Sequence, residues 1–339
     1  MQRRGEREMK SVVVSGDRFF MKFGDLSYFE ERAREAGAVI VPVEDREDDV
    51  FGRKVKDASA VIVIDRRIGP DVIRGLVRCE ILMALSVGYD CIDVESATEM
   101  RIPVCHVPAY CTDDVANHAM ALLLAISRKL VPFANELKKG NWDYNFGKPL
   151  YNCRGRMLGI IGLGRIGRAV VPKAGGFGMK VSAYDPYLDD DIFESLGVTR
   201  KHELADLLRD SDYLTIHAPL TEETLHMMNA EAFRAMKAHA VIVNTARGKI
   251  IDEKALFEAL EEKRIAGAGL DVVASEPAGR DNPLLACDNV IVTPHVAWYS
   301  EESFKNAMVM TMDEVVSVLG GHRPRYVVNP EVLWKRKVQ

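Results

Sequence analysis

Three side chains that can carry charge, Arg247, Glu276 and His295, each come a few residues after a short apolar run in the second half of the chain. In an open α/β sheet the ligand crevice lies at the carboxyl ends of the strands, where such residues can converge. A histidine exchanges a proton near neutral pH, a carboxylate beside it favours the imidazolium, and a guanidinium pairs with a carboxylate or a developing alkoxide. Together they suit the reduction of a carbonyl next to a carboxylate. Taken singly, each also fits a surface ion pair, a loop residue or a packed ring.

A glycine motif, G-x-G-x-x-G, follows an apolar run and precedes a helix-like run and a second apolar run. Gly162 suits a tight turn, Gly164 the close approach of a pyrophosphate, and Gly167 the packing of the helix on the strand. The phosphates would lie at the helix N-terminus, and Asp185, at the end of the second strand, would accept hydrogen bonds from ribose hydroxyls. A turn without a ligand is the alternative, but this context favours dinucleotide binding. The residues assigned to the cofactor here are Gly162, Gly164, Arg165, Ile166, Gly167 and Asp185.

Asp185 also bears on the choice between NAD and NADP. A carboxylate at this position repels a 2′-phosphate, and the following Pro186 and Tyr187 offer no arginine to receive one. The sequence therefore predicts NAD.

The composition is that of an ordinary globular protein. The chain has 339 residues, 47% of them hydrophobic and 28% charged, with a formal charge of −5. This length predicts two domains, and the mixed charges predict neither nucleic-acid nor membrane binding.

The cysteines and the first residues bear on location. The six cysteines are scattered without a C-x-x-C pair, and there is no H-E-x-x-H motif. We therefore expect reduced thiols, no bound metal and a cytoplasmic protein. Residues 1–10 are polar, unlike a signal peptide, and the longest apolar run, 119–126, is too short to cross a bilayer.

Apolar and helix-like stretches alternate before the glycine motif. Strands are expected at 11–14, 39–43, 60–64, 81–85 and 103–107, and helices at 25–36 and from Pro70 onward. This alternation predicts a parallel sheet with helices on both faces.

A long helix is expected to begin at Thr112, whose hydroxyl suits a cap, and to be buried because it is apolar almost all round to Ile126. Residues 138–156 predict an irregular arm, and Gly175-Gly176 is expected to fray the helix that follows the glycine motif. Further strands are expected at 213–217, 241–244, 267–271 and 290–293, helices at 252–263 and 301–319, and an extended return at 323–329.

The sequence resembles the D-isomer-specific 2-hydroxyacid dehydrogenase family at 158–167 with Asp185, 217–220, 243–248, 269–277 and 293–295. The resemblance implies an NAD-dependent oxidoreductase that interconverts a small 2-keto acid and the D-2-hydroxy acid. It implies a catalytic set of Arg247, Glu276 and His295, with His295 as the acid in reduction and the base in oxidation. It places further cofactor contacts at His217, Pro219, Thr224, Thr245, Ala246 and Asp271, the last at the nicotinamide end. It places substrate contacts at Ser86, Val87 and Gly88, whose backbone N–H groups take the carboxylate, and at Arg247 and Trp298.

The family's fold is α/β, with two doubly wound parallel-sheet domains, Rossmann-like and flavodoxin-like, hinged around a cleft. By the resemblance, residues 1–110 with 301–339 form the substrate domain and residues 111–300 the NAD-binding domain. The resemblance also implies a homodimer through the NAD-binding domain, helped by an arm at 141–150.

Residues 184–188 and 297–300 resemble the C-terminal-binding-protein branch of this family, animal corepressors that kept the dehydrogenase fold. This leaves an alternative function, an NAD(H)-sensing dimeric interaction protein with secondary catalysis. Trp298, which follows the candidate catalytic histidine, predicts a preference for a larger organic side chain over phosphite or formate. A buried core or interface aromatic is the other interpretation of Trp298.

Overall fold

The computed structural model describes residues 9–16, 26–45, 47–64 and 66–335. The chain forms two compact units, unit 1 (residues 1–110 with 301–339) and unit 2 (residues 111–300). Residues 1–8 and the predicted helix start at Asp25 lie outside the described residues.

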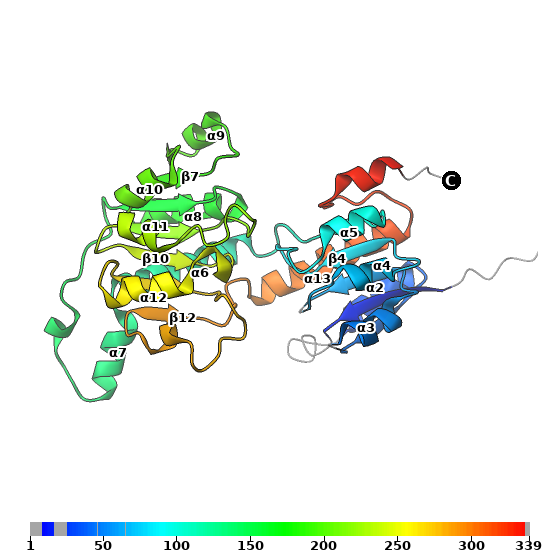
Figure 1. Cartoon of the computed structure of the whole chain (residues 1–339), viewed down its shortest axis with the longest axis horizontal. Helices are drawn as coiled ribbons and strands as arrows, with labels where there is room; N and C mark the ends of the chain where they lie inside the picture. Colours follow the sequence, from blue (N-terminus) through cyan, green and yellow to red (C-terminus); the bar gives the residue numbers. More distant parts are fainter. Residues whose placement is uncertain (1–8, 17–25, 46, 65, 336–339) are drawn as a thin grey trace, which may run out of the picture. The chain divides into compact units, whose positions relative to one another are not determined.

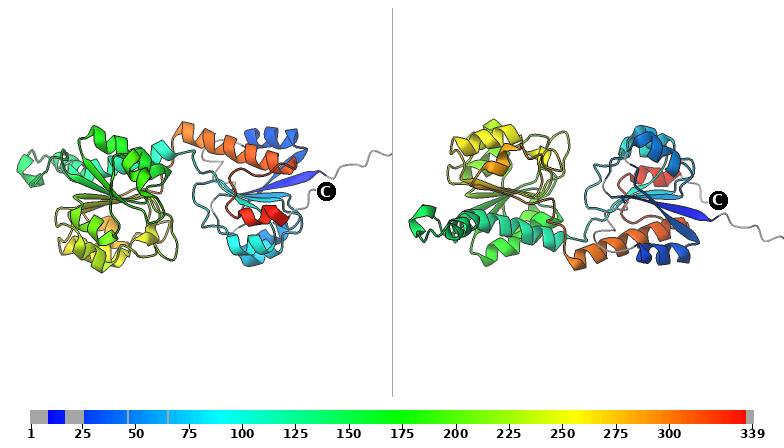
Figure 2. Two further views of the ribbon diagram at one scale, coloured as in Figure 1. Left: turned by 90° about the horizontal axis from the view of Figure 1, so that it is seen from above. Right: turned by 90° about the horizontal axis from the view of Figure 1, so that it is seen from below.

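Unit 1 is built on a five-stranded parallel sheet in the order β2-β1-β3-β4-β5. The strands are β1 (Lys10–Ser15), β2 (Ala38–Val43), β3 (Ala60–Val63), β4 (Ile81–Ala84) and β5 (Val104–Cys105). Helices α2 (Ser27–Glu35) and α13 (Glu301–Leu319) cover one face, and α3 (Asp48–Val55), α4 (Pro70–Arg74) and α5 (Val94–Glu99) cover the other (Figures 1 and 2). Strands β3 and β4 are wholly buried and apolar, as expected for a sheet covered on both faces.

The C-terminal part of the chain closes the edge of this sheet. Val327 forms an antiparallel bridge with Cys105, and the Val328 N–H donates to the Val104 carbonyl at 2.7 Å. Glu314, fully buried on α13, accepts hydrogen bonds from the backbone N–H groups of Arg325 and Tyr326. A buried carboxylate thus holds the returning segment against β5, before the short 3₁₀ helix η4 (Pro330–Lys335).

Unit 2 contains a seven-stranded parallel sheet in the order β12-β11-β10-β9-β6-β7-β8. Its strands are β6 (Met157–Ile161), β7 (Lys180–Tyr184), β8 (Thr199–Arg200), β9 (Tyr213–Ile216), β10 (Val241–Asn244), β11 (Gly267–Leu270) and β12 (Val290–Val292). Helices α6 (Thr112–Ser127), α8 (Arg165–Gly176) and α9 (Asp190–Ser195) pack on one face, and α10 (Leu204–Asp210), α11 (Ala230–Ala235) and α12 (Glu253–Glu261) on the other (Figure 2). The strand order reverses between β6 and β9, the switch point at which such sheets bind ligands. The predicted fold class is confirmed.

Two local predictions in unit 2 are wrong. Thr112 is not the cap of α6, because Cys111 occupies the N-cap position and Thr112 is already the first helical residue. Nor does Gly175-Gly176 fray α8, since the helix runs to Gly176 before Phe177 caps it. The predicted arm begins where α7 (Leu130–Lys138) ends and contains one short 3₁₀ helix, η1 (Tyr144–Gly147).

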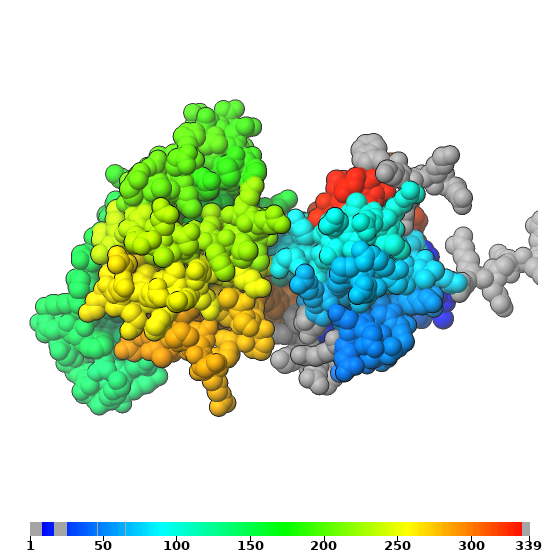
Figure 3. All heavy atoms as spheres, viewed as in Figure 1, coloured from blue at the N-terminus to red at the C-terminus, as the bar shows by residue number. Residues whose placement is uncertain are grey.

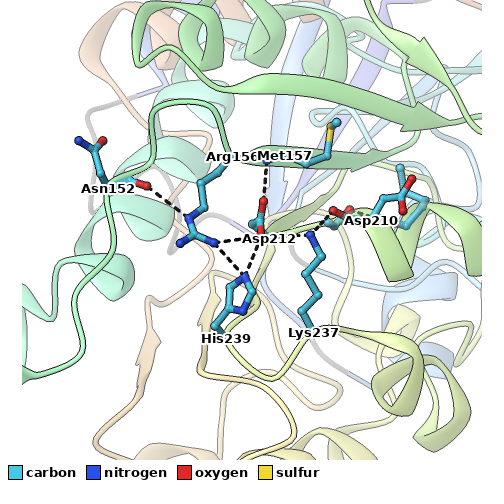
Figure 4. A network of polar contacts seen from close by, with 9 residues as sticks. Asn152, Arg156, Met157, Asp210, Asp212, Lys237 and His239 are labelled. Carbon is cyan, nitrogen blue, oxygen red and sulfur yellow. Dashed lines mark hydrogen bonds and ion pairs between the residues drawn. The ribbon is translucent and has the colours of Figure 1, made fainter.

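A network of charges ties together the amino-terminal ends of β6, β9 and β10 (Figure 4). Asp212 accepts hydrogen bonds from the Met157 N–H at 2.8 Å, from His239 Nε2 at 2.7 Å and from Lys237 Nζ at 3.1 Å, and it pairs with Arg156 at 3.2 Å. Burial alone would raise the pKa of Asp212, but these donors outweigh it and hold the pKa well below its usual value. The network thus lies at the edge of the sheet opposite to the carboxyl ends.

Candidate active site

The three candidate catalytic residues follow three neighbouring strands of unit 2. Asn244, the last residue of β10, pairs with Leu270 at the end of β11, which pairs with Val292 at the end of β12. Because the strands are parallel and in register, the loops that carry Arg247, Glu276 and His295 begin side by side at one edge of the sheet.

The Arg247 loop is shaped by a residue that the sequence analysis did not select. Asn244 is fully buried, and its side-chain oxygen accepts from the Ala246 N–H at 3.0 Å while its amide donates to the Arg247 carbonyl at 2.9 Å. Gly248 lies so close to the next loop that an added Cβ would be 2.0 Å from the Val273 carbonyl carbon. The signal in the sequence was an Asn at a strand end, a residue that often bonds its own turn.

Glu276 and His295 form a direct pair. His295 Nδ1 lies 2.7 Å from Glu276 Oε2, and the other carboxylate oxygen accepts from the Val273 N–H at 3.2 Å. Burial would raise the pKa of Glu276, but the hydrogen bond and charge of His295, the Val273 N–H and the nearby Arg247 together lower it. Glu276 is thus held as a carboxylate, and because His295 Nδ1 is occupied, Nε2 is the ring nitrogen left for a substrate.

The backbone of His295 has an uncommon conformation. Its φ is +51°, in the left-handed region that costs a non-glycine residue roughly 1–2 kcal/mol. The His295 N–H donates to the Asp271 carbonyl at 2.8 Å. Strain of this kind persists only where surrounding contacts hold it.

Those contacts come from the Asp271 side chain. Its carboxylate is almost fully buried and accepts from Thr293 Oγ1 at 2.6 Å, from the Val296 N–H at 2.9 Å and from the Ala297 N–H at 2.8 Å. His118 of α6 also contacts this loop, with its Nε2 3.0 Å from Thr293 Oγ1. The carboxylate is thus turned into the loop that carries His295, and a cofactor contact for Asp271 stays a prediction.

Trp298 belongs to the same loop. Its indole N–H donates to the His295 carbonyl at 2.9 Å, and its ring packs edge-on against Tyr299 with centroids 5.4 Å apart. The side chain is half-buried, so it supports the loop while leaving part of the ring exposed. A substrate contact for Trp298 stays a prediction.

The glycine turn has the space that a dinucleotide needs. Gly162 has a φ of +86°, and an added Cβ would lie 2.7 Å from the Ala218 backbone nitrogen. At Gly167 an added Cβ would lie 2.3 Å from the Gly162 carbonyl oxygen, whereas at Gly164 it would meet nothing within 4 Å. Two of the glycines are thus required by the packing of the turn, and Gly164 leaves open space at the N-terminus of α8, as close approach of a pyrophosphate requires.

Two further residues assigned to the cofactor carry buried polar atoms with no hydrogen-bond partner in the described part of the chain, His217 Nδ1 and Thr245 Oγ1. They follow the neighbouring strands β9 and β10, and burial lowers the pKa of His217 to about 3, so its ring is neutral. Buried polar atoms normally have partners. A polar ligand at this edge of the sheet would supply them.

The remaining cofactor positions surround the same turns. Asp185 accepts from the backbone N–H of Leu163 at 2.9 Å and of Tyr187 at 3.1 Å, so its carboxylate is fixed beside the glycine turn. Thr224 donates to the Pro219 carbonyl at 2.7 Å and shapes the loop after β9. Two others, Arg165 and Ile166, open helix α8, and Ala246 lies in the Arg247 turn.

The predicted carboxylate loop lies in unit 1, directly after β4. The carbonyls of Ser86, Val87 and Gly88 accept, respectively, from the Val107 N–H at 3.0 Å, His106 Nδ1 at 2.7 Å and Ser86 Oγ at 2.6 Å. A peptide's N–H points away from its C=O. Because no described residue accepts from the N–H groups of Val87 and Gly88, these donors are available for an anion.

Among the described residues, no group of three or more His, Cys, Asp or Glu side chains is placed to hold a metal ion. No helix in the described ranges is long and apolar enough to span a membrane.

Comparison with known proteins gives concordant results. Residues 120–297 match the family model described as D-isomer specific 2-hydroxyacid dehydrogenase, NAD binding domain. A glyoxylate reductase of Korarchaeum cryptofilum is 40% identical over 288 residues, which cover 84% of this chain and 86% of the relative.

Solved structures agree. The NADPH-dependent glyoxylate/hydroxypyruvate reductase of Sinorhizobium meliloti, in complex with NADP and malonate, aligns with a TM-score of 0.85 at 28% identity, covering 98% of this chain and 100% of that chain. The D-lactate dehydrogenase of Aquifex aeolicus, complexed with NAD and lactic acid, aligns with a TM-score of 0.82 at 29% identity, covering 97% and 99%.

The chain belongs to the D-isomer specific 2-hydroxyacid dehydrogenase family, as its sequence motifs predicted, and unit 2 contains the family's NAD-binding domain. It is an oxidoreductase of that family's type with NAD(P) as cofactor, which confirms the predicted nicotinamide dinucleotide. Its placement in the C-terminal-binding-protein branch stays a prediction.

Proposed function

We propose that this protein reduces a small 2-keto acid to the D-2-hydroxy acid with NADH, and catalyses the reverse oxidation. The observation that carries the proposal is the 2.7 Å contact between His295 Nδ1 and Glu276 Oε2, beside Arg247 at the carboxyl ends of neighbouring strands. The named relatives support the substrate class, since they include a glyoxylate reductase and a D-lactate dehydrogenase.

The roles follow from the contacts of each side chain. When bound, the dinucleotide supplies the hydride for the carbonyl carbon. His295 holds a proton at Nε2 and releases it to the carbonyl oxygen as the alkoxide forms, and Glu276 stabilises the imidazolium. Arg247 takes the substrate carboxylate, the developing alkoxide, or both. The backbone N–H groups of the Ser86–Gly88 loop would also donate hydrogen bonds to the substrate carboxylate.

The cofactor is NAD in preference to NADP. The carboxylate of Asp185 is fixed beside the glycine turn by two backbone N–H groups, where it favours ribose hydroxyls and repels a 2′-phosphate. Residues Gly162, Gly164, Gly167, His217 and Thr245 would hold the rest of the dinucleotide.

The proposal is tested by following NADH absorbance with glyoxylate, hydroxypyruvate, pyruvate, phosphohydroxypyruvate and the methionine-derived keto acid. Turnover that is lost in His295→Ala supports it, and absence of turnover on the whole panel favours the NAD(H)-sensing alternative. Glu276→Gln keeps the shape of the side chain but removes its charge, so it tests whether reduction needs the charge of the carboxylate or only its hydrogen bond to His295 Nδ1. If the variant keeps parental kcat, Glu276 orients the ring and its charge is not required.

The protein is further proposed to be a cytoplasmic homodimer. None of the six cysteines forms a disulfide in the described part of the chain, as a reducing compartment allows. Helix α7 has no buried residue, and Trp142 and Tyr144 of the arm are 88% and 76% exposed. The segment that contains α7 and the arm lies on the surface of unit 2 (Figure 3). Large exposed aromatics mark interaction sites. Sedimentation velocity of the parent and of Trp142→Glu tests this, with a monomeric parent as the contrary result.

A further inference from the structure

The loop between β4 and α5 holds its backbone in one orientation through contacts at successive carbonyl oxygens. Those of Ser86 and Gly88 are held by the Val107 N–H and by Ser86 Oγ, and that of Tyr89 accepts from the Ile92 N–H at 2.9 Å. The carbonyl between them, that of Val87, accepts from an imidazole. Val87 is therefore held by a side chain from elsewhere in the chain, His106.

We propose that His106 is a positioning residue for the substrate carboxylate, because it fixes the peptide whose other end is the Gly88 N–H. This rests on the proposed function, in which the Ser86–Gly88 loop takes the carboxylate. The contact is 2.7 Å from His106 Nδ1 to the Val87 oxygen. A carbonyl oxygen only accepts, so Nδ1 must carry the proton.

The Val87–Gly88 peptide needs such a contact. Glycine populates positive and negative φ about equally, so a peptide that precedes glycine can rotate at little cost. With the carbonyl held by His106, the Gly88 N–H is turned to the opposite side, where an anion can bind it. Without the hydrogen bond from His106, the Gly88 N–H has no fixed orientation, and part of the binding free energy of the carboxylate goes into ordering it.

His106 is itself held on several sides. Its ring packs edge-on against Tyr89, with centroids 5.4 Å apart and planes at 81°. Its backbone N–H donates to the Tyr326 carbonyl at 3.3 Å, and the Tyr326 N–H donates to the buried Glu314 at 3.0 Å. The C-terminal return thus fixes His106, and His106 fixes the loop at Val87.

Two variants separate this role from simple packing. His106→Leu removes the donor, whereas His106→Asn keeps an N–H at about the same distance from Cβ as Nδ1. His322→Leu, on the surface of the same unit, is the matched control. The measurements are kcat, KM for glyoxylate, KM for NADH, the inhibition constant of oxalate and the melting temperature.

We expect KM for glyoxylate and the oxalate constant to rise about tenfold in His106→Leu, because ordering the Gly88 N–H then offsets about the free energy of its one hydrogen bond to the carboxylate. The values should return to near parental in His106→Asn, with kcat and KM for NADH little changed in both. An unchanged KM in His106→Leu, or a His106→Asn variant that is folded but as weak as His106→Leu, overturns the proposal.

Two NMR measurements keep the test independent of turnover. The ¹⁵N shifts of the His106 ring should show the Nδ1–H tautomer in the parent, and the Nε2–H tautomer overturns the proposal even if His106→Leu does not fold. Oxalate should shift the Gly88 amide resonance in the parent and in His106→Asn. If the parent reduces no keto acid, the proposed function fails, while this shift still decides whether the loop binds carboxylates with the help of His106.

Discussion

Replacing Asp271 with asparagine should disable the loop that carries His295 while leaving the rest of unit 2 intact. The carboxylate accepts from Thr293 Oγ1 and from the backbone N–H groups of Val296 and Ala297 at 2.6–2.9 Å. An asparagine has one acceptor oxygen, so its amide nitrogen must face one of these donors. At least one hydrogen bond to a buried charge is therefore lost, and the asparagine N–H groups face another hydrogen-bond donor.

The expected magnitude follows from these contacts. Losing a hydrogen bond to a charged group costs roughly 1.5–3 kcal/mol. The left-handed backbone of His295 adds strain of roughly 1–2 kcal/mol that the loop must still overcome. If the active conformation of the loop is destabilised by about 3 kcal/mol, its population drops by about a hundredfold, since 1.4 kcal/mol corresponds to a factor of ten. We therefore expect kcat to fall by about 10- to 100-fold.

The assay compares Asp271→Asn with the parent in steady-state reduction of the best keto acid, at a temperature where circular dichroism shows both to be folded. Asp288→Asn, an exposed aspartate in the same unit, is the control and should keep parental kcat. A kcat within threefold of the parent would refute the argument that Asp271 holds the loop. A large rise in KM for NADH at constant kcat would instead support the predicted role of Asp271 as a cofactor residue.

The other predictions concern the cofactor, the substrate and stability. The parent should use NADH with a far higher kcat/KM than NADPH, and Asp185→Ala should narrow the gap, because the carboxylate repels a 2′-phosphate. Arg247→Lys should lower kcat/KM by about 100-fold, since an ammonium cannot reproduce the planar fork of a guanidinium. Trp298→Ala should weaken reduction of the methionine-derived keto acid more than that of glyoxylate, by loss of apolar contact. Asp212→Asn should lower the free energy of unfolding by about 2 kcal/mol, because it leaves Arg156 and Lys237 without their carboxylate.

Acid titration extends the Asp212 prediction. The folded-state pKa of Asp212 is lowered, so its contribution to stability is complete above its unfolded value of about 4 and is lost as the pH falls toward the folded value. In urea unfolding, the parent should thus lose more stability than Asp212→Asn below about pH 4. Parallel losses in the two proteins contradict this, and a changed KM in the variant would show that the network reaches the active site.

Each of the other three has its own contrary result. Equal efficiency of the parent with NADH and NADPH removes Asp185 as the discriminator. If Arg247→Lys keeps most of its activity, the Arg247 guanidinium does not bind the substrate carboxylate. Equal losses on both keto acids in Trp298→Ala would leave the indole with its observed structural role, the hydrogen bond to the His295 carbonyl.

The sequence alone predicted the fold class, which is confirmed, and the residues of the candidate site. The spacing of Gly162, Gly164 and Gly167 between two apolar runs predicted a strand, a turn and a helix, and a side chain at Gly162 or Gly167 would indeed collide with backbone atoms. Short apolar runs separated by helix-like stretches predicted parallel sheets, and the polar residues after those runs predicted a common edge. These are local signals, carried by residues near one another in the chain.

Tertiary structure decided which partner each polar group takes. Asp271 follows a strand like any candidate ligand, yet its carboxylate bonds residues 293–297, because β11 and β12 lie side by side. Likewise, Asn244 shapes the Arg247 turn, and His106 reaches Val87 only because β4 and β5 pair. Thr112 lost its expected capping role because Cys111 took the cap position. Hydrogen-bond partners of this kind depend on distances between segments far apart in sequence, which composition and spacing do not contain.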